Sequence, residues 1–261
     1  MKIPLYQIDA FTSTLFHGNP AAVCPLEAWL QTEQMQAIAA ENNLSETAFF
    51  VQRADHYELR WFTPQIEIDL AGHPTLATAC VIFQYLKPTL AKINFSTKSG
   101  MLTVTRDGSL LTMDFPARPG SPCAIPDDLV QGLGAAPQEV LLARDYLVVY
   151  DSEEFVRTLR PNFDRLSQLD CLGIIVTAPG KDADFVSRFF APKAGILEDP
   201  VTGSAHCTLV PYWANRLEKK HLHTFQVSQR GGELFCEDLG ERVKMAGYAV
   251  TYLEGWIHLE P

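Results

Sequence analysis

The chain has 261 residues, of which 47% are hydrophobic, so it can form two ordinary domains or one large domain with a buried core. Its 31 acidic and 21 basic residues give a net charge of −10, and its longest basic run is Lys219-Lys220, which argues against a nucleic-acid partner. The sequence shows no signal-peptide pattern at its N-terminus and no stretch of transmembrane length, which predicts a cytoplasmic protein without a membrane partner.

In the first half, the pattern predicts an amphipathic helix from about Leu26 to Glu41. A polar loop ending at Glu46 follows, and then the apolar strand 47–51. Residues 76–86 are apolar nearly all round, with Pro74 at a plausible first helical position, which is typical of a buried central helix.

Short alternating stretches joined by glycine turns predict antiparallel hairpins over 93–97, 102–106 and 110–115. Residues 116–122 contain three prolines and a glycine and read as an interdomain linker. Further strands are predicted around 147–150, 224–227, 233–236 and 248–253. A second apolar helix is expected from near Ser204 to Leu217, kinked at Pro211.

The two halves of the sequence contain an internal repeat. Arg60-Trp61-Phe62-Thr63-Pro64 in the first half returns as Arg188-Phe189-Phe190-Ala191-Pro192 in the second, and each motif ends a strand-like stretch. A glycine opens the next apolar helix in both halves, eight residues after Pro64 and eleven after Pro192. Several elements in the same order indicate two similar domains.

The repeat predicts an α+β fold of two pseudo-symmetric domains, each a curled antiparallel β-sheet around a central helix. We expect residues 1–115 to form the N-terminal domain together with the C-terminal strand 249–261. Residues 116–248 would form the second domain, with the active site in the cleft between them.

Both repeated helices begin after a glycine, and a helix N-terminus attracts anions through its unpaired N–H groups and its dipole. If the two helix starts faced one cleft, they would bind a carboxylate whose charge grows when a proton is removed. The alternative is that Gly72 and Gly203 only permit tight turns.

Proton removal next to a carboxylate also needs a positioned base, for which Glu46 is the candidate. His73 and Asp199 lie at the mouths of the two helices, and we expect them to occupy equivalent positions. Each of the three has a plainer alternative: a solvated turn glutamate, a capping histidine and a turn-forming aspartate.

The six cysteines contain no C-x-x-C pair, which favours reduced, buried thiols over disulfides or a zinc site. A nucleophilic Cys207 beside His206 is a further alternative, but the sequence shows no activating arrangement around this thiol.

Five motifs together resemble the PhzF-like (phenazine biosynthesis F) family, and they span essentially the whole chain. They lie at residues 9–23, 44–49, 60–64, 71–75 and 199–206. The resemblance implies the diaminopimelate-epimerase fold with an active site between two domains, no cofactor, no metal, and often a homodimer.

The resemblance also implies site residues. The family's catalytic residues fall on Glu46, His73, Asp199 and Ser204, and the backbone amides that hold its substrate fall at Gly72 and Gly203. Thr202 is a further substrate-binding candidate, and Asn19 resembles a substrate-positioning residue of the wider superfamily. The related diaminopimelate and proline racemases use two cysteines at the helix mouths, which this chain lacks, so a two-thiol mechanism is excluded.

These features predict an isomerase or epimerase in a biosynthetic process that transfers a proton on a small carboxylate-bearing metabolite, with Glu46 in acid/base catalysis. The alternative hypothesis is a non-catalytic protein that keeps the fold and binds a metabolite or another protein.

Overall fold

The computed structural model describes residues 1–259, and the described chain separates into two compact units. Unit 1 is Met1–Asp114 together with the segment that begins at Ala246, and unit 2 is Phe115–Met245. Residues 260–261 of the predicted C-terminal strand lie outside the described residues. Within residues 1–259, no helix is both long and apolar enough to cross a membrane.

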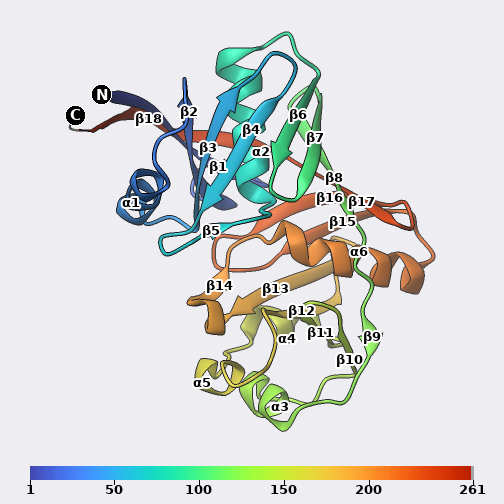
Figure 1. Ribbon diagram of the computed structural model, residues 1–261. Helices are drawn as coiled ribbons and strands as arrows, with labels where there is room; N and C mark the ends of the chain where they lie inside the picture. Colours follow the sequence, from blue (N-terminus) through green and yellow to red (C-terminus); the bar gives the residue numbers. More distant parts are fainter. Residues whose placement is uncertain (260–261) are drawn as a thin grey trace. The chain divides into compact units, whose positions relative to one another are not determined.

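Unit 1 contains the first seven strands, most of the eighth, the last strand and two helices (Figure 1). Its strands are β1 (Lys2–Ala10), β2 (Asn19–Leu26), β3 (Glu46–Gln52), β4 (Tyr57–Phe62), β5 (Glu67–Ile68), β6 (Lys92–Thr97), β7 (Gly100–Asp107), β8 (Leu110–Pro116) and β18 (Ala249–His258). Its helices are α1 (Thr32–Asn42) and α2 (His73–Val81), and α2 continues into a π-helical turn, Ile82–Leu86. The central helix predicted over 76–86 is therefore confirmed, with a wider last turn that ends in the bond from Lys87 N to Ile82 O.

Unit 2 contains the remaining strands and helices. Its strands are β9 (Ser121–Pro122), β10 (Glu139–Leu142), β11 (Tyr146–Val149), β12 (Ile174–Pro179), β13 (Phe185–Ala191), β14 (Ile196–Asp199), β15 (His221–Gln226), β16 (Gly232–Asp238) and β17 (Arg242–Gly247). Its helices are α3 (Asp127–Leu133), α4 (Glu153–Thr158), α5 (Phe163–Leu166) and α6 (Gly203–Leu217). Helix α6 matches the predicted second central helix and continues across Pro211.

The sheets are mixed, whereas the sequence pattern predicted antiparallel pairing alone. The hairpin β6–β7–β8 is antiparallel as expected. Four neighbouring pairs are parallel: β2–β3, β4–β6, β11–β12 and β13–β15. Each parallel pair is joined by a connection that contains a helix, because two parallel neighbours need a long crossover.

The first helix begins later than predicted. The sequence pattern placed its start near Leu26, but β2 extends to that residue and α1 begins at Thr32. Gln31 stands before the first turn, where its N–H donates to Gln34 Oε1 at 3.3 Å. The apolar residues before it, Trp29 and Leu30, lie in a loop that packs against the hydrophobic cluster under α1. In the sequence, their spacing resembled the apolar face of a helix.

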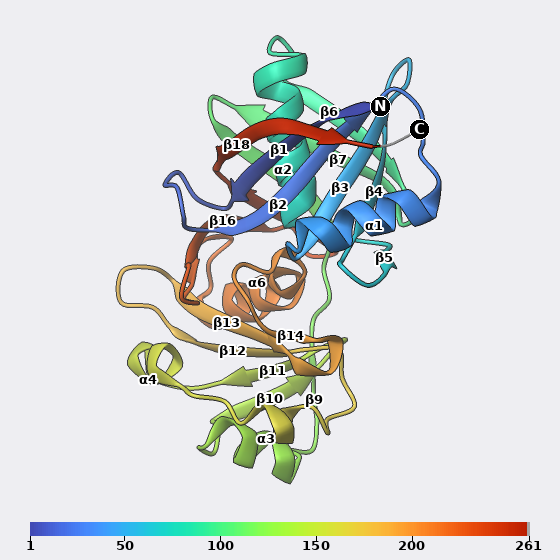
Figure 2. The same cartoon turned by 90° about the vertical axis from the view of Figure 1, so that its left-hand side faces the viewer.

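In each unit, two sets of helices cover opposite faces of the sheet. In unit 1, Phe49 of β3 packs with Met35 and Ile38 of α1, while α2 contacts β1, β2 and β3 (Figure 2). In unit 2, Val176 of β12 packs under α4, and the next residue, Thr177, accepts a hydrogen bond from Trp213 of α6 at 2.9 Å. Neighbouring strand residues point to opposite faces, so α4 and α6 lie on opposite sides of β12.

Candidate active site

Glu46 is the first residue of β3 and follows the loop that ends α1. It pairs with Ala21 of the parallel strand β2, so its backbone is fixed by the sheet. Its side chain is only 12% exposed, unlike that of a solvated turn glutamate. The sheet therefore holds this carboxylate at a mostly buried position.

His73, the first residue of α2, lies beside Glu46. Its Nε2 is 3.0 Å from Glu46 Oε2, within ion-pair distance. The two atoms are not aligned as a regular hydrogen bond, but rotation about the last side-chain bond of Glu46, which has a broad torsional preference, can align them. The side chain of His73 is 6% exposed, so this pair forms in a largely water-free setting.

Asn19 fixes the orientation of the His73 ring. The Asn19 side chain is fully buried, and its Nδ2 lies 3.1 Å from His73 Nδ1. An amide nitrogen only donates, so in this orientation Nδ1 accepts and the proton of a neutral ring is on Nε2, which faces Glu46. Asn19, His73 and Glu46 thus form one connected group at the start of α2.

In unit 2, the loop between β14 and α6 is held by an internal network. Thr202 donates from its hydroxyl to Asp199 Oδ2, and its N–H donates to Gln226 Oε1 at 2.8 Å. The Gln226 amide in turn donates to Asp199 O at 2.8 Å and to Thr202 Oγ1 at 3.1 Å. Because the N–H of Thr202 is bonded to Gln226 of β15 and its hydroxyl to Asp199, this geometry favours a role in orienting Asp199.

Ser204 is the second residue of α6, and a charged pair lies next to it. Arg144 donates from Nη2 to Ser204 Oγ at 3.0 Å and to Asp145 Oδ2 at 2.8 Å. Asp145 is 2% exposed and Arg144 is partly exposed, so the arginine neutralises a buried carboxylate and still presents a cationic edge beside Ser204.

Sequence reasoning did not identify Gln226, Arg144 or Asp145. They lie on a strand and a hairpin turn far from Asp199 and Ser204 in the sequence, and no spacing links them to these residues. In the sequence, a buried polar residue on a strand cannot be distinguished from a solvated one until its partners are known.

The registers of the two sheets correct one expected equivalence. Trp61 of β4 pairs with Ile68, and Phe189 of β13 pairs with Asp199. Trp61 and Phe189 are equivalent in the repeated motif, so Asp199 corresponds to Ile68 and not to His73. The extra residues of the second loop form a short 3-10 turn at Pro192–Ala194, before Asp199, and therefore His73 corresponds to Ser204.

The two glycines do not serve left-handed turns. Gly72 has φ −80° and ψ −62°, and Gly203 is the first residue of α6. Both glycines are buried and lie at helix starts, as predicted. Steric freedom at positive φ therefore does not explain them, whereas close approach of another group to the backbone would.

His206 and Cys207 are both buried in α6. Burial lowers the pKa of His206 to about 4 and raises the pKa of the Cys207 thiol to about 11, although Arg118 and Arg144 act against the latter shift. A neutral buried thiol is a poor nucleophile, so the alternative of cysteine catalysis gains no support from this arrangement.

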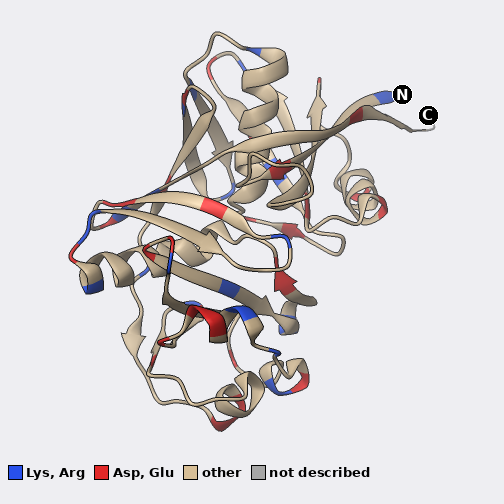
Figure 3. Cartoon of the chain, turned by 180° about the vertical axis from the view of Figure 1, so that it is seen from behind, with Lys and Arg blue, Asp and Glu red and all other residues tan. Residues whose placement is uncertain are grey.

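Charge is distributed over both units. Figure 3 shows Asp and Glu positions interspersed with Lys and Arg along the strands and helices of each unit. The cationic Arg144 beside Ser204 is therefore a local feature of a protein that is acidic as a whole.

Comparisons with known proteins agree with the motifs and the fold. The model of the phenazine biosynthesis-like protein family matches residues 8–255. A Pseudomonas aeruginosa protein named as an uncharacterized isomerase is 54% identical over 259 residues, which cover 99% of this chain and 100% of that protein.

Solved structures show the same architecture. The crystal structure of a PhzF-family phenazine biosynthesis protein from Enterococcus faecalis has a TM-score of 0.97 and 47% identity, covering 99% of this chain and 100% of that one. A hydroxyproline epimerase from Agrobacterium vitis has a TM-score of 0.66 at 10% identity, covering 98% and 92%, and shares the fold alone. The predicted epimerase-like α+β fold is confirmed. The chain is therefore an isomerase of the phenazine biosynthesis-like, or PhzF, family.

Proposed function

We propose that the protein is a cofactor-independent isomerase or epimerase that moves a proton on a small carboxylate-bearing metabolite, with Glu46 as the acid/base group. The observation that carries this proposal is the Asn19–His73–Glu46 group at the start of α2. A carboxylate that is mostly buried and lies beside an oriented imidazole supports a role as general base.

The proton balance of the reaction is simple. Glu46 takes a proton from the carbon next to the substrate carboxylate, and the electron pair of the C–H bond delocalises into an enediolate. While the enediolate is present, the proton on Glu46 exchanges with solvent, and Glu46 then returns a proton to another carbon or to the other face. His73, whose Nε2 lies 3.0 Å from Glu46 Oε2, holds this carboxylate in position. The reaction needs no oxidant and no leaving group.

The enediolate needs positive partners. We propose that both half-sites act on one substrate in a cleft between the units, where the backbone at Gly72 and Gly203 binds its carboxylate. Ser204, with Arg144 behind it, supports the developing charge. Asp199, oriented by Thr202, assists proton transfer on the other side of the substrate.

Solvent exchange tests this proposal. The protein is incubated with dicarboxylates and amino acids in deuterated water, and mass spectrometry measures deuterium at carbon positions. We expect incorporation with the unmodified protein and its loss in Glu46→Gln, which keeps the size of the side chain but removes the base. Glu41→Gln, at an exposed position of α1, serves as the matched control. Exchange at an undiminished rate in Glu46→Gln would show that another group is the base.

A further inference from the structure

The repeated R-x-F-x-P motif contains the same ion pair in both units. In unit 1, Arg60 donates from Nε to Glu67 Oε1 at 2.7 Å and from Nη2 to Glu67 Oε2 at 2.9 Å. In unit 2, Arg188 makes the same two bonds to Glu198 at 2.7 and 2.9 Å. Two parallel N–H···O bonds between a guanidinium and a carboxylate fix orientation as well as distance.

Each arginine also contacts an aromatic ring and donates hydrogen bonds to a helix. The Arg60 guanidinium lies over the Phe62 ring, with 5.2 Å to the ring centroid, and donates to Thr32 Oγ1 at the start of α1. The Arg188 guanidinium lies 4.9 Å over Phe190 and donates to two backbone carbonyls at the end of α4. In both units, the arginine anchors its glutamate to the helix on the outer face of the sheet, which is the face opposite the central helix.

The two glutamates lie at the same sequence separation from the glycines that begin the central helices. Glu67 precedes Gly72 by five residues, and Glu198 precedes Gly203 by five. Each glutamate is therefore the last residue anchored to the outer face before the chain turns into the loop and the central helix. Asp199 follows Glu198 directly in β14, so its side chain points to the opposite face, on the side of α6.

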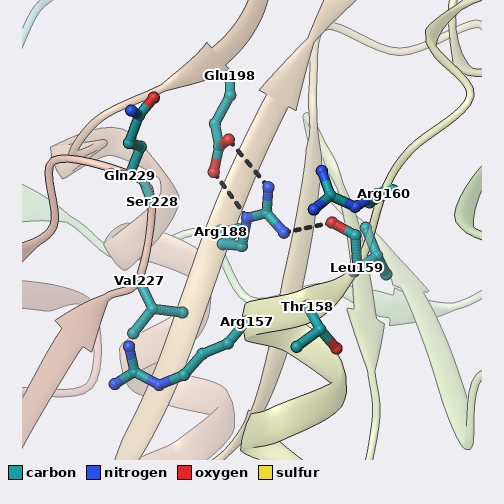
Figure 4. A pocket seen from close by; sticks show the side chains of 9 residues that line it. All are labelled: Arg157, Thr158, Leu159, Arg160, Arg188, Glu198, Val227, Ser228 and Gln229. Carbon is teal, nitrogen blue, oxygen red and sulfur yellow. Dashed lines mark hydrogen bonds and ion pairs between the residues drawn. The ribbon is translucent and has the colours of Figure 1, made fainter.

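Packing alone does not hold Glu198 in place. A cavity of about 450 Å³ opens beside the Arg188–Glu198 pair, lined also by Arg157, Arg160 and Ser228 (Figure 4). The Glu198 side chain is 23% exposed. With open space on one side, the ion pair fixes this residue, and Ser228 fixes the next part of the loop by donating to Pro200 O at 2.8 Å.

We propose that Arg60–Glu67 and Arg188–Glu198 are paired positioning devices of the active site: the first holds the segment leading to Gly72 and His73, and the second holds Asp199 and the segment leading to Gly203. This inference rests on the proposed function. The four residues touch no substrate; they act through the loops that carry the reacting groups. A displacement of about 1 Å in such a group can lower the rate about a hundredfold.

Hydrogen–deuterium exchange of the folded protein tests the holding role without any substrate. Glu198→Gln keeps the shape of the side chain and removes its charge, and we expect faster amide exchange over 199–205 with unchanged exchange over 68–74. Glu67→Gln should give the reverse pattern. Asp128→Asn, which breaks the exposed pair with Arg165 in unit 2, is the control and should change neither segment. Unchanged exchange in both segments for both variants would overturn the proposal.

Kinetics separate positioning from stability alone. In the deuterium-incorporation assay, Glu198→Gln should lower kcat at least about tenfold and raise KM by a smaller factor, because the loosened segment also carries the backbone at Gly203. A loosened loop with undiminished kcat would also overturn the proposal. If Glu198→Gln does not fold, Glu198→Asp, which keeps the charge on a shorter stem, takes its place. If the unmodified protein exchanges no carboxylate at all, the proposed function fails, while the amide-exchange experiment still decides whether the pairs hold the loops.

Discussion

The two units share one order of elements but not one set of chemical groups. In both, a helical crossover joins two parallel strands, an arginine of the next strand binds a glutamate, and a glycine opens a buried central helix. The register aligns Phe49 with Val176, since these residues face Arg60 and Arg188, and Glu46 then corresponds to Gly173. Only unit 1 has a carboxylate at this position.

This difference teaches that the repeat preserves the scaffold and not the chemistry. The parts that hold the loops are present twice, whereas the group proposed as the base occurs once. At the helix starts, His73 of unit 1 is replaced by Ser204 in unit 2. A duplicated fold can thus support a one-sided proton transfer, in which one unit supplies the base and the other supplies assisting groups.

The largest difference in stability that we expect between the two units is at their central helices. Trp213 of α6 is 1% exposed, stacks on Phe185 with 5.6 Å between ring centroids and donates to Thr177. Its counterpart in unit 1, ten residues after the glycine, is Ile82. We expect Trp213→Ala to lower the free energy of unfolding by about 4 kcal/mol, measured by urea denaturation, and Ile82→Val by about 1 kcal/mol. Equal losses would mean that the two helices are anchored alike.

The next effect concerns pH. His206 is fully buried and donates from Nδ1 to Thr202 O at 2.9 Å, while the corresponding Thr75 of unit 1 donates to Ala71 O at 2.6 Å. Burial lowers the folded-state pKa of His206 to about 4, below its ordinary value of 6.5. Between pH 6.5 and pH 4 the unfolded chain therefore binds one more proton at this histidine than the folded chain does. The contribution of neutral His206 to the free energy of unfolding is complete above pH 6.5 and is lost as the pH falls toward 4.

We therefore expect the free energy of unfolding to drop by up to about 3 kcal/mol from this histidine over that interval. His206→Thr introduces the residue found at the corresponding position of unit 1, Thr75. The substitution should remove this part of the pH dependence, even if it lowers the free energy of unfolding equally at every pH. Urea titrations at several pH values measure it. An unchanged slope in the variant would show that the pKa of His206 is the same in the folded and unfolded chain.

The smallest expected effect tests why unit 2 has no counterpart of Glu46. A Cβ added at Gly173 would lie 2.2 Å from Cζ of the buried Phe189 ring. We expect Gly173→Ala to lower the free energy of unfolding by about 2 kcal/mol, because a packed ring must move. Gly134→Ala is no suitable control because its φ is positive, whereas Ala135→Ser in the following loop keeps the backbone. A loss below about 0.5 kcal/mol would mean that this position could accept a side chain.

Much of the fold followed from local patterns. The central helices were predictable because their segments are apolar on every side, and the hairpins β6–β7–β8 because their strands alternate between glycine turns. The parallel pairs were not predictable, because strand alternation is the same for either direction of pairing. The start of α1 was misplaced because Trp29 and Leu30 are partly buried in a loop that packs against the core under α1.

For the candidate site, the motifs predicted Glu46, His73 and Asp199, and they included Asn19 and Thr202 only as substrate-binding residues, not as groups that orient His73 and Asp199. Asn19 was singled out as substrate-binding, and its contact with His73 became visible only in the structure. The partners Gln226 and Arg144 lie 24 and 60 residues from the groups they contact. Their polar side chains carry no sequence signal of burial or partner.

The sequence by itself determined the family, the epimerase-like fold and the repeat, because these depend on residue identity and spacing along the chain. The tertiary structure decided which residues are true counterparts: Glu67 with Glu198, His73 with Ser204, and Glu46 with Gly173. Equivalence between two halves is a matter of register and side-chain direction, which strand pairing sets and linear spacing does not. The repeated R-x-F-x-P motif, visible from the start, acquired its physical meaning only when each arginine was found bound to a glutamate on a neighbouring strand.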